Sequence, residues 1–365
     1  PGVRTKAYLD KYDEPPMVLG ELITGSRGNQ QLEVLSGAML KEGDVIQIEW
    51  YNKEGENSTL IRALYGNTAL KIGSHHWNYA DHALIQQQTI IRKVSGTKIE
   101  IADPLLMDIR KEWSPKMVEW KHLEEVGIEH FKITFPGAPN IAHHIEEGYN
   151  GIYLTRLFNG WVRDVRIENA DSGILTEETA NVTIKDIETF GSKLAHYAVS
   201  MSGVHNVLVE NLWVKNKVRH PLSFNTFSTK SVYVNCQLDT EPVLDQHSGV
   251  NHQNLFDQVT VKVTLDSNRT YPLFAGGGAG YWKPSHGAYT TFWNITIDFQ
   301  NGFESTQPVK LNGMTDGPKA RLIGVHGNLP VVIDYQPNPY TESINSKIAE
   351  IPSLYYYQLK NRTTR

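Results

Sequence analysis

Three short segments recur at a fixed interval in the middle of this chain. NVTIKD (181–186), NVLVEN (206–211) and SVYVNC (231–236) follow one another every 25 residues. In each segment apolar side chains alternate with polar ones, which is typical of a β-strand that buries one face. Short strands at this period predict an all-β fold. We expect a single-stranded right-handed parallel β-helix, a solenoid whose coils stack about 4.8 Å apart.

The repeat also divides the chain into three parts. Strand-like segments continue on both sides of it, so we place the solenoid at residues 111–340. Residues 1–110 are less regular and predict a β-rich N-terminal cap or opening coils, with a separate β domain as the alternative. Residues 341–365 predict a C-terminal cap or tail. A turn ladder that satisfies backbone groups is expected at three equivalent positions, Asp186, Asn211 and Cys236.

Composition excludes several classes of protein. A net charge of -5 argues against a nucleic-acid partner, although basic side chains could still line a groove for a polyanion. No apolar run approaches the ~20 residues that span a bilayer, so we expect no membrane span. Cys236 is the single cysteine, which excludes an internal disulfide. The first residues, PGVRTKAYLD, do not read as an export signal, so any such signal was removed or never existed. The oligomeric state is left open.

Three histidines recur at one position of the repeat. Each lies eleven or twelve residues before a valine of the strand that follows it: His196, His220 and His247. The preceding unit has Asp171 at this position. If the coils are in register, the three imidazoles lie about 5 Å apart. We therefore predict a polar stripe on the solenoid and expect the chemistry there.

Such a stripe suits β-elimination of a uronic acid polymer. Imidazoles this close cannot all be protonated cheaply, so at least one should be neutral and able to act as a general base. Arg219 and Lys193 flank the stripe and would neutralise the substrate carboxylate. Asp171 would charge-balance the first imidazole. Tyr197 is a candidate proton donor or substrate contact, although strand alternation places it opposite His196. The predicted catalytic residues are His196, His220, His247, Arg219 and Lys193, with Asp171 and Tyr197 as substrate contacts.

Two further segments are candidates for substrate binding. The run 250–257 contains His252 and Asn254, which could bind sugar hydroxyls or form a polar turn. The glycine-rich run 275–294 does not have the spacing of a phosphate loop and reads as a long loop over the coil surface. It carries an aromatic ring, a cation and an imidazole that would suit a carbohydrate groove: Trp282, Lys283 and His286.

A zinc ion held by the three imidazoles is an alternative to acid–base chemistry. Linear stacking along a sheet suits tetrahedral coordination poorly, so we predict no metal ligands. We expect no cofactor. Calcium would be compatible with the fold, but no aligned column of acidic residues indicates it.

The chain resembles the right-handed parallel β-helix polysaccharide lyases over about residues 120–330. The resemblance is carried by the units from Asn181 to Cys236 and by the entry GIYL and WVRDVRIENADSGI. DQHSGVNHQNLFD and SHGAYTTFWNI are also similar to secreted β-helix proteins of polysaccharide-degrading bacteria. The resemblance implies a secreted or periplasmic protein that degrades an acidic polysaccharide, sulfated or unsulfated. The histidine-rich stripe departs from the acidic calcium cluster of many such enzymes and favours a metal-free mechanism.

Three hypotheses follow. The leading one is a polysaccharide lyase that acts on a uronate-containing polymer. The second is a β-helix glycoside hydrolase that uses the carboxylates of Asp171, Asp245 or Asp257, which would require two carboxyl groups about 5–9.5 Å apart across one groove. The third is a non-catalytic glycan-binding or tailspike-like protein.

Overall fold

A computed structural model describes residues 15–37, 39–55, 58–66, 77–137, 139, 141–142, 144–247, 249–278, 280–285, 287–313 and 317–363. The chain divides into two compact units. One comprises residues up to 60, 70–72 and 78–121, and the other comprises residues 61–69, 73–77 and 122–365. Each unit is described by itself.

The first unit is a closed barrel of six antiparallel strands. Alternate residues of its third strand, among them Ile46, Ile48 and Trp50, are completely buried and form part of its core. The barrel also extends past residue 110, because its last strand pairs with both the first and the third. The strands are β1 (Val18–Gly25), β2 (Gln31–Val34), β3 (Val45–Tyr51), β4 (Ala83–Ser95), β5 (Lys98–Ile101) and β6 (Lys116–Glu119), in the order β1-β2-β5-β4-β3-β6.

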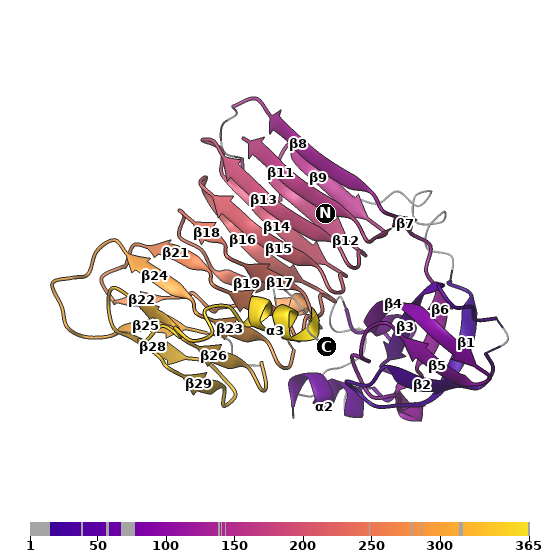
Figure 1. Cartoon of the computed structure of the whole chain (residues 1–365). Helices are drawn as coiled ribbons and strands as arrows, with labels where there is room; N and C mark the ends of the chain where they lie inside the picture. Colours follow the sequence, from indigo (N-terminus) through magenta and orange to yellow (C-terminus); the bar gives the residue numbers. More distant parts are fainter. Residues whose placement is uncertain are drawn as a thin grey trace. The chain divides into compact units, whose positions relative to one another are not determined.

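The second unit is a parallel β-helix, as the repeat predicts (Figure 1). Its long sheet contains β8 (Gly127–Thr134), β11 (Trp161–Glu168), β13 (Thr183–Phe190), β15 (Leu208–Val214), β17 (Val232–Val234), β18 (Gln237–Leu238), β20 (Leu255–Asp257), β21 (Thr260–Val263), β23 (Thr291–Trp293), β24 (Thr296–Phe299), β26 (Arg321–Ile323), β27 (His326–Gly327) and β29 (Tyr340–Glu342). A five-stranded sheet contains β9 (Asn150–Thr155), β12 (Ser172–Glu177), β14 (Ala195–Ser202), β16 (Val218–Asn225) and β19 (Leu244–His247).

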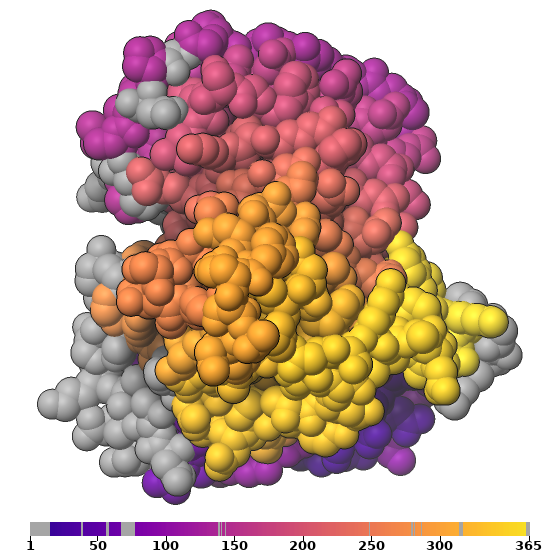
Figure 2. All heavy atoms as spheres, turned by 90° about the vertical axis from the view of Figure 1, so that its left-hand side faces the viewer, coloured from indigo at the N-terminus to yellow at the C-terminus, as the bar shows by residue number. Residues whose placement is uncertain are grey.

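Smaller elements complete this unit. The remaining parallel pairs are β7 (Leu123–Glu124) with β10 (Leu157–Phe158), and β22 (Thr270–Tyr271) with β25 (Val309–Asn312) and β28 (Val331–Asp334). The helices in the part of the chain that the structure describes are short: α2 (Thr59–Tyr65), α3 (Leu354–Thr363) and two 3₁₀ turns, η1 (Lys111–Trp113) and η2 (Gly280–Trp282). None of those in the described residues has the length and apolar character needed to cross a membrane. The C-terminal coils and tail form one continuous surface, orange to yellow in Figure 2.

Part of the expected N-terminal region belongs to the solenoid. The Tyr65 hydroxyl accepts a hydrogen bond from the Val250 backbone N–H at 2.6 Å, and the Trp77 indole donates to the Trp282 carbonyl at 3.0 Å. A Cβ on Gly249 would lie 2.0 Å from the Trp77 ring. Residues 61–66 and Trp77 therefore pack on the coils that carry residues 249–282.

The predicted turn ladder forms with one correction. The Asn211 amide donates to Asp186 at 2.8 Å, and the next rung is Asn235, whose amide donates to Asn211 at 2.6 Å. Cys236 is instead buried. All three ladder residues have φ of 54–56°. Asn and Asp tolerate this left-handed conformation better than most residues, which explains why asparagine occupies the rung. The strand register agrees, because Leu208 pairs with Val232, 24 residues later.

The core of the solenoid contains a stack of aromatic rings. Phe256 is completely buried, and its ring lies 5.2 Å from that of Phe292 at an interplanar angle of 4°. The rings of Tyr233 and Phe224 lie 5.7 Å and 4.8 Å from it. Equivalent side chains on successive coils thus meet face to face or edge to face.

This stack predicts a large stability effect. Phe256→Ala should lower the free energy of unfolding by about 3–5 kcal/mol, since it removes buried contacts and leaves a cavity. Phe303→Ala is the control, because Phe303 is 59% exposed, and it should change stability by less than about 0.5 kcal/mol. Urea unfolding followed by circular dichroism measures both. Equal losses in the two variants would contradict the assigned core.

Candidate functional site

The outward face of the five-stranded sheet is polar over its last three strands. Val199, Leu222 and Leu244 are fully buried members of the core on β14, β16 and β19. Because neighbouring side chains of a strand point to opposite faces, the residues next to these point outward. They bring together hydroxyl, amide, carboxylate and imidazole groups: Ser200 on β14, Ser223 and Asn225 on β16, and Asp245 and His247 on β19.

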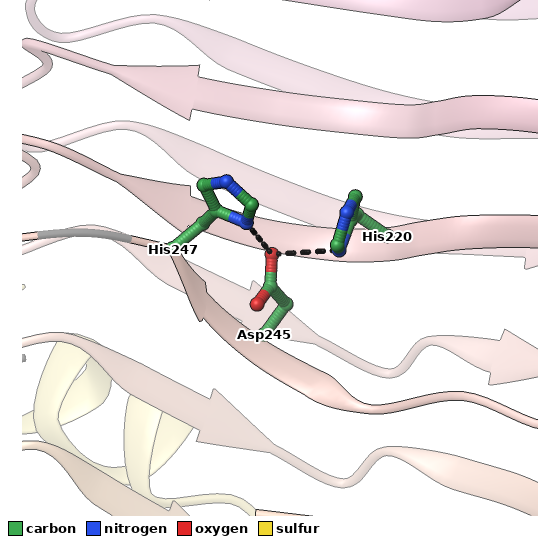
Figure 3. A group of neighbouring side chains, drawn as sticks. All are labelled: His220, Asp245 and His247. Atoms are coloured by element: carbon green, nitrogen blue, oxygen red, sulfur yellow. Dashed lines mark ion pairs between the residues drawn. The ribbon is translucent and has the colours of Figure 1, made fainter. Parts of the chain in front are cut away.

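Asp245 is the centre of this face. Its Oδ2 lies 3.1 Å from His220 Nδ1 and 3.3 Å from His247 Nδ1 (Figure 3). The Ser223 hydroxyl donates to the same oxygen at 2.7 Å, and the Gly277 backbone N–H donates to Oδ1 at 2.9 Å. The carboxylate is completely buried, whereas the two imidazoles are 16% and 17% exposed. One buried acid therefore holds two histidines that reach the surface.

The environment keeps Asp245 ionised. Burial alone would raise its pKa, but the hydrogen bonds and charges of His220 and His247 outweigh burial and hold the pKa well below its usual range. An ionised carboxylate can only accept hydrogen bonds, so the ring nitrogen facing it, Nδ1, carries a proton. In a neutral ring Nε2 is then the basic nitrogen. Asp245 thus sets the tautomer of both imidazoles.

A second imidazole–carboxylate pair lies beside the first. Glu146 Oε1 is 3.2 Å from His196 Nδ1, and the His196 ring lies 5.5 Å from that of His220. The Tyr197 ring stacks on His196 at 4.3 Å, although alternation predicts opposite faces for these neighbours, so that expectation is wrong. Burial and the charge of Asp245 raise the pKa of Tyr197 despite a hydrogen bond with Asn225 that lowers it. Tyr197 is therefore protonated at neutral pH.

The three predicted histidines do come together, but not in the predicted register. His220 pairs along the ladder with Tyr197, and His247 pairs with Asn225. The coils of this sheet advance by 23 and 22 residues there, shorter than the 25-residue spacing of the long sheet. His220 and His247 are therefore not paired along the ladder, but their side chains reach toward each other, and the two rings lie 4.7 Å apart.

Lys193 and Asp171 form a buried ion pair with each other. Lys193 Nζ lies 2.7 Å from Asp171 Oδ1, and the two side chains are 2% and 3% exposed. Burial lowers the pKa of Lys193, but its contacts with Asp171 and Glu147 raise it by more. The structure corrects the roles expected for both, because their charges neutralise each other inside the protein.

Arg219 is exposed and precedes His220 in β16. Its guanidinium forms no ion pair with any residue that the structure describes, and alternation counted from the buried Leu222 places Arg219 on the same face as Ser223. Its expected role, to neutralise a substrate carboxylate, stays a prediction.

His252 and Asn254 lie inside the coil. Both are 1% exposed. Asn254 accepts the Ser231 N–H at 3.0 Å and donates to the Ser228 carbonyl at 2.9 Å, and His252 forms a backbone bridge with Thr229. The expected contact of these two residues with a substrate is therefore corrected, since the Asn254 side chain bonds to the backbone of the preceding coil and the His252 side chain is buried.

The glycine-rich segment approaches the site closely. A Cβ on Gly277 would lie 2.4 Å from His247 Nδ1 and 2.5 Å from Asp245 Oδ1, so no larger residue fits there without displacing them. Trp282 ends η2 and is partly exposed, Lys283 is exposed, and His286 lies outside the described residues. The backbone of this segment thus packs directly against Asp245 and His247.

The sequence pointed only indirectly to several residues of the site. Asp245 is expected only as a candidate carboxylate of the hydrolase alternative, and Glu146 is not among the predicted site residues. The signal that could have found the others is alternation within the strand that holds His220, PLSFN, where Ser223 and Asn225 share a face. Contacts with residues on other coils have no local signal.

The site also has a donor set suited to some metal ions. The ligand atoms of His220, Asp245 and His247 lie within 4.8 Å of one another. Two imidazoles and one carboxylate suit Zn²⁺, whereas calcium takes six to eight oxygen ligands. In the part of the chain that the structure describes, no other such group of histidine, cysteine or acidic side chains occurs.

No family model and no curated protein matches this chain. Among solved structures it is similar to the tailspike protein gp49 from Pseudomonas phage LKA1 (12% identity, TM-score 0.47) and to the Pseudomonas phage phi297 tailspike gp61 (11%, 0.43). It is also similar to the gp54 tailspike of Acinetobacter baumannii bacteriophage AP22, solved in complex with A. baumannii capsular saccharide (11%, 0.35). Each match covers 90% of this chain and 61%, 58% and 64% of the respective tailspike, so the chain spans about three fifths of their length. At these identities and TM-scores the likeness carries no argument about activity.

The fit of Gly277 gives a direct test of the site geometry. Gly277→Ala should lower the free energy of unfolding by about 1–3 kcal/mol, because the added methyl group overlaps Asp245 and His247. Gly280→Ala is the matched control, since a Cβ there meets nothing within 4 Å. Thermal and urea unfolding compare the two. A Gly277→Ala variant as stable as the control would show that the segment does not pack on Asp245.

Proposed function

We propose that this protein is a metal-independent polysaccharide lyase that cleaves a uronate-containing polymer, sulfated or unsulfated, by β-elimination. One observation carries the proposal: a buried, ionised Asp245 faces Nδ1 of both His220 and His247. This arrangement makes Nε2 of a neutral imidazole the basic atom and fixes the ring that carries it. The substrate is an acidic polysaccharide, and the protein acts outside the cell or in the periplasm.

The proposed reaction uses the groups of this face. His220 Nε2 takes the proton from the carbon next to the uronate carboxylate, and the electron pair of that C–H bond becomes the new C=C bond. The glycosidic C–O bond breaks, and the leaving oxygen receives a proton from the Tyr197 hydroxyl. His247 in its protonated form supplies the positive charge that stabilises the carboxylate-linked carbanion. Lys193, expected for that task, lies in a buried ion pair, whereas Arg219 is exposed next to His220 and stays a candidate for it.

The hydrolase alternative is less well supported, because its three candidate aspartates hold internal contacts. Asp171 is paired with Lys193, and Asp245 with the two histidines. Asp257 Oδ2 accepts the Tyr355 N–H and the Ser353 hydroxyl, both at 2.7 Å, at the start of α3. Burial raises the pKa of Asp257 to about 6, but the group is 0% exposed.

Substitution of His220 tests the proposal. On a panel of alginate, pectin, ulvan, fucoidan and glycosaminoglycans, the wild type should release products with the ultraviolet absorbance of an unsaturated uronate. His220→Ala should lower kcat by about 10²-fold to 10⁴-fold through loss of the base. The histidine control is His130→Ala on β8, whose side chain is 60% exposed; it should keep full activity. Reducing ends without new absorbance would indicate hydrolysis, and binding without products a glycan-binding protein. Either result would refute elimination.

Metal removal tests the acid–base mechanism separately. Dialysis against EDTA should leave the lyase activity unchanged, because Asp245 and the imidazoles need no ion in the proposed steps. Activity that disappears on dialysis and returns with Zn²⁺ would instead assign His220, Asp245 and His247 as metal ligands. Elemental analysis of the purified protein provides the control for tightly held metal.

A further inference from the structure

Residues 146–149 precede β9. Asp171, the residue before β12, holds this segment in place through its carboxylate and its backbone. Asp171 Oδ2 accepts the backbone N–H groups of Gly148 and Tyr149, both at 2.8 Å. The main chains add two more bonds, from the Asp171 N–H to the Tyr149 carbonyl at 2.8 Å and from the His196 N–H to the Asp171 carbonyl at 2.6 Å. Asp171 thus connects this segment to the strand that carries His196.

Lys193 completes the attachment. Its ammonium group lies 2.7 Å from Asp171 Oδ1, 3.3 Å from Glu147 Oε2 and 4.7 Å from the centre of the Tyr149 ring. Two buried charges of opposite sign are retained in a protein when each satisfies the other. Here their contacts converge on the three residues Glu147–Tyr149, directly after Glu146.

The segment carries a carboxylate to an imidazole of the site. Glu146 Oε1 lies 3.2 Å from His196 Nδ1, which repeats the relation of Asp245 to His220. Asp245 needs no such attachment, since it lies within β19. Glu146 lies outside any helix or strand, so its place opposite His196 depends on the contacts of its neighbours.

We propose that Asp171 and Lys193 are positioning residues that hold Glu146 against His196, and that Glu146 sets the tautomer of this imidazole. His196 then presents a defined Nε2 beside His220, so that the substrate meets two oriented imidazoles. This inference rests on the proposed function only where it concerns turnover. The position of Glu146 and the tautomer of His196 are properties of the protein without substrate.

A kinetic cycle tests whether Lys193 acts through Glu146. Glu146→Gln and Lys193→Met should each lower kcat by about 10-fold to 100-fold with little change in KM, as for other groups that orient a functional imidazole. The double variant should be no slower than the slower single variant. Lys185→Met, which removes another ion-paired lysine on β13, should keep wild-type kcat. Losses that multiply in the double variant, or an unchanged kcat in Lys193→Met, would overturn the proposal.

Asp171→Asn is the alternative variant if Lys193→Met does not fold. If thermal unfolding shows that Lys193→Met does not fold, Asp171→Asn takes its place in the cycle, because asparagine keeps an acceptor for the two N–H groups and removes the charge that holds Lys193. The same non-additivity with Glu146→Gln is expected, and additive losses count against the proposal.

Nuclear magnetic resonance of the imidazole nitrogens tests the positioning without a substrate. The His196 signals are assigned by their loss in His196→Gln. Glu146→Gln and Lys193→Met should move these signals in the same direction, toward a mixture of tautomers, and Lys185→Met should not. If no polysaccharide is cleaved, the proposed function fails while this measurement still decides the positioning. His196 signals that stay unchanged in Lys193→Met would overturn the positioning even in an active enzyme.

Discussion

The candidate site depends on the charge of one buried side chain, Asp245. A carboxylate with no solvent exposure is tolerated because the Ser223 hydroxyl and the Gly277 backbone N–H donate hydrogen bonds to it and two imidazoles face it at 3.1 and 3.3 Å. The two imidazoles keep it ionised, so it can only accept hydrogen bonds. The orientation of both imidazoles follows from this charge.

The parallel β-helix can carry such a polar face without losing backbone hydrogen bonds or core packing. The backbone groups of β14, β16 and β19 are satisfied by the ladders between them, and the inward side chains fill the core. The outward positions are therefore free to carry polar groups. Close covering segments complete the face: Gly277 packs on Asp245, and Glu146 faces His196.

Two kinds of charged residue surround the site and differ in role. Lys193 and Asp171 neutralise each other in the interior and fasten a neighbouring segment, whereas Asp245 directs its charge at groups that reach the surface. The distinction lies in the partners, since an acidic or basic side chain acts on a substrate only if its charge is not already compensated. This is why a flanking lysine, plausible as a catalytic cation from its place in the chain, has another role in the fold.

Alternation and period predict the solenoid from the amino-acid sequence alone, because they are local properties that parallel pairing must satisfy. The sequence also brought His196, His220 and His247 to one sheet, since they recur near the start or end of equivalent strands. Only the tertiary structure decided the closed N-terminal barrel, the register of the sheet, the pairing of Lys193 with Asp171 and the central place of Asp245. These depend on turn lengths and on contacts between residues far apart in the chain, and a slip of one residue changes which side chains meet.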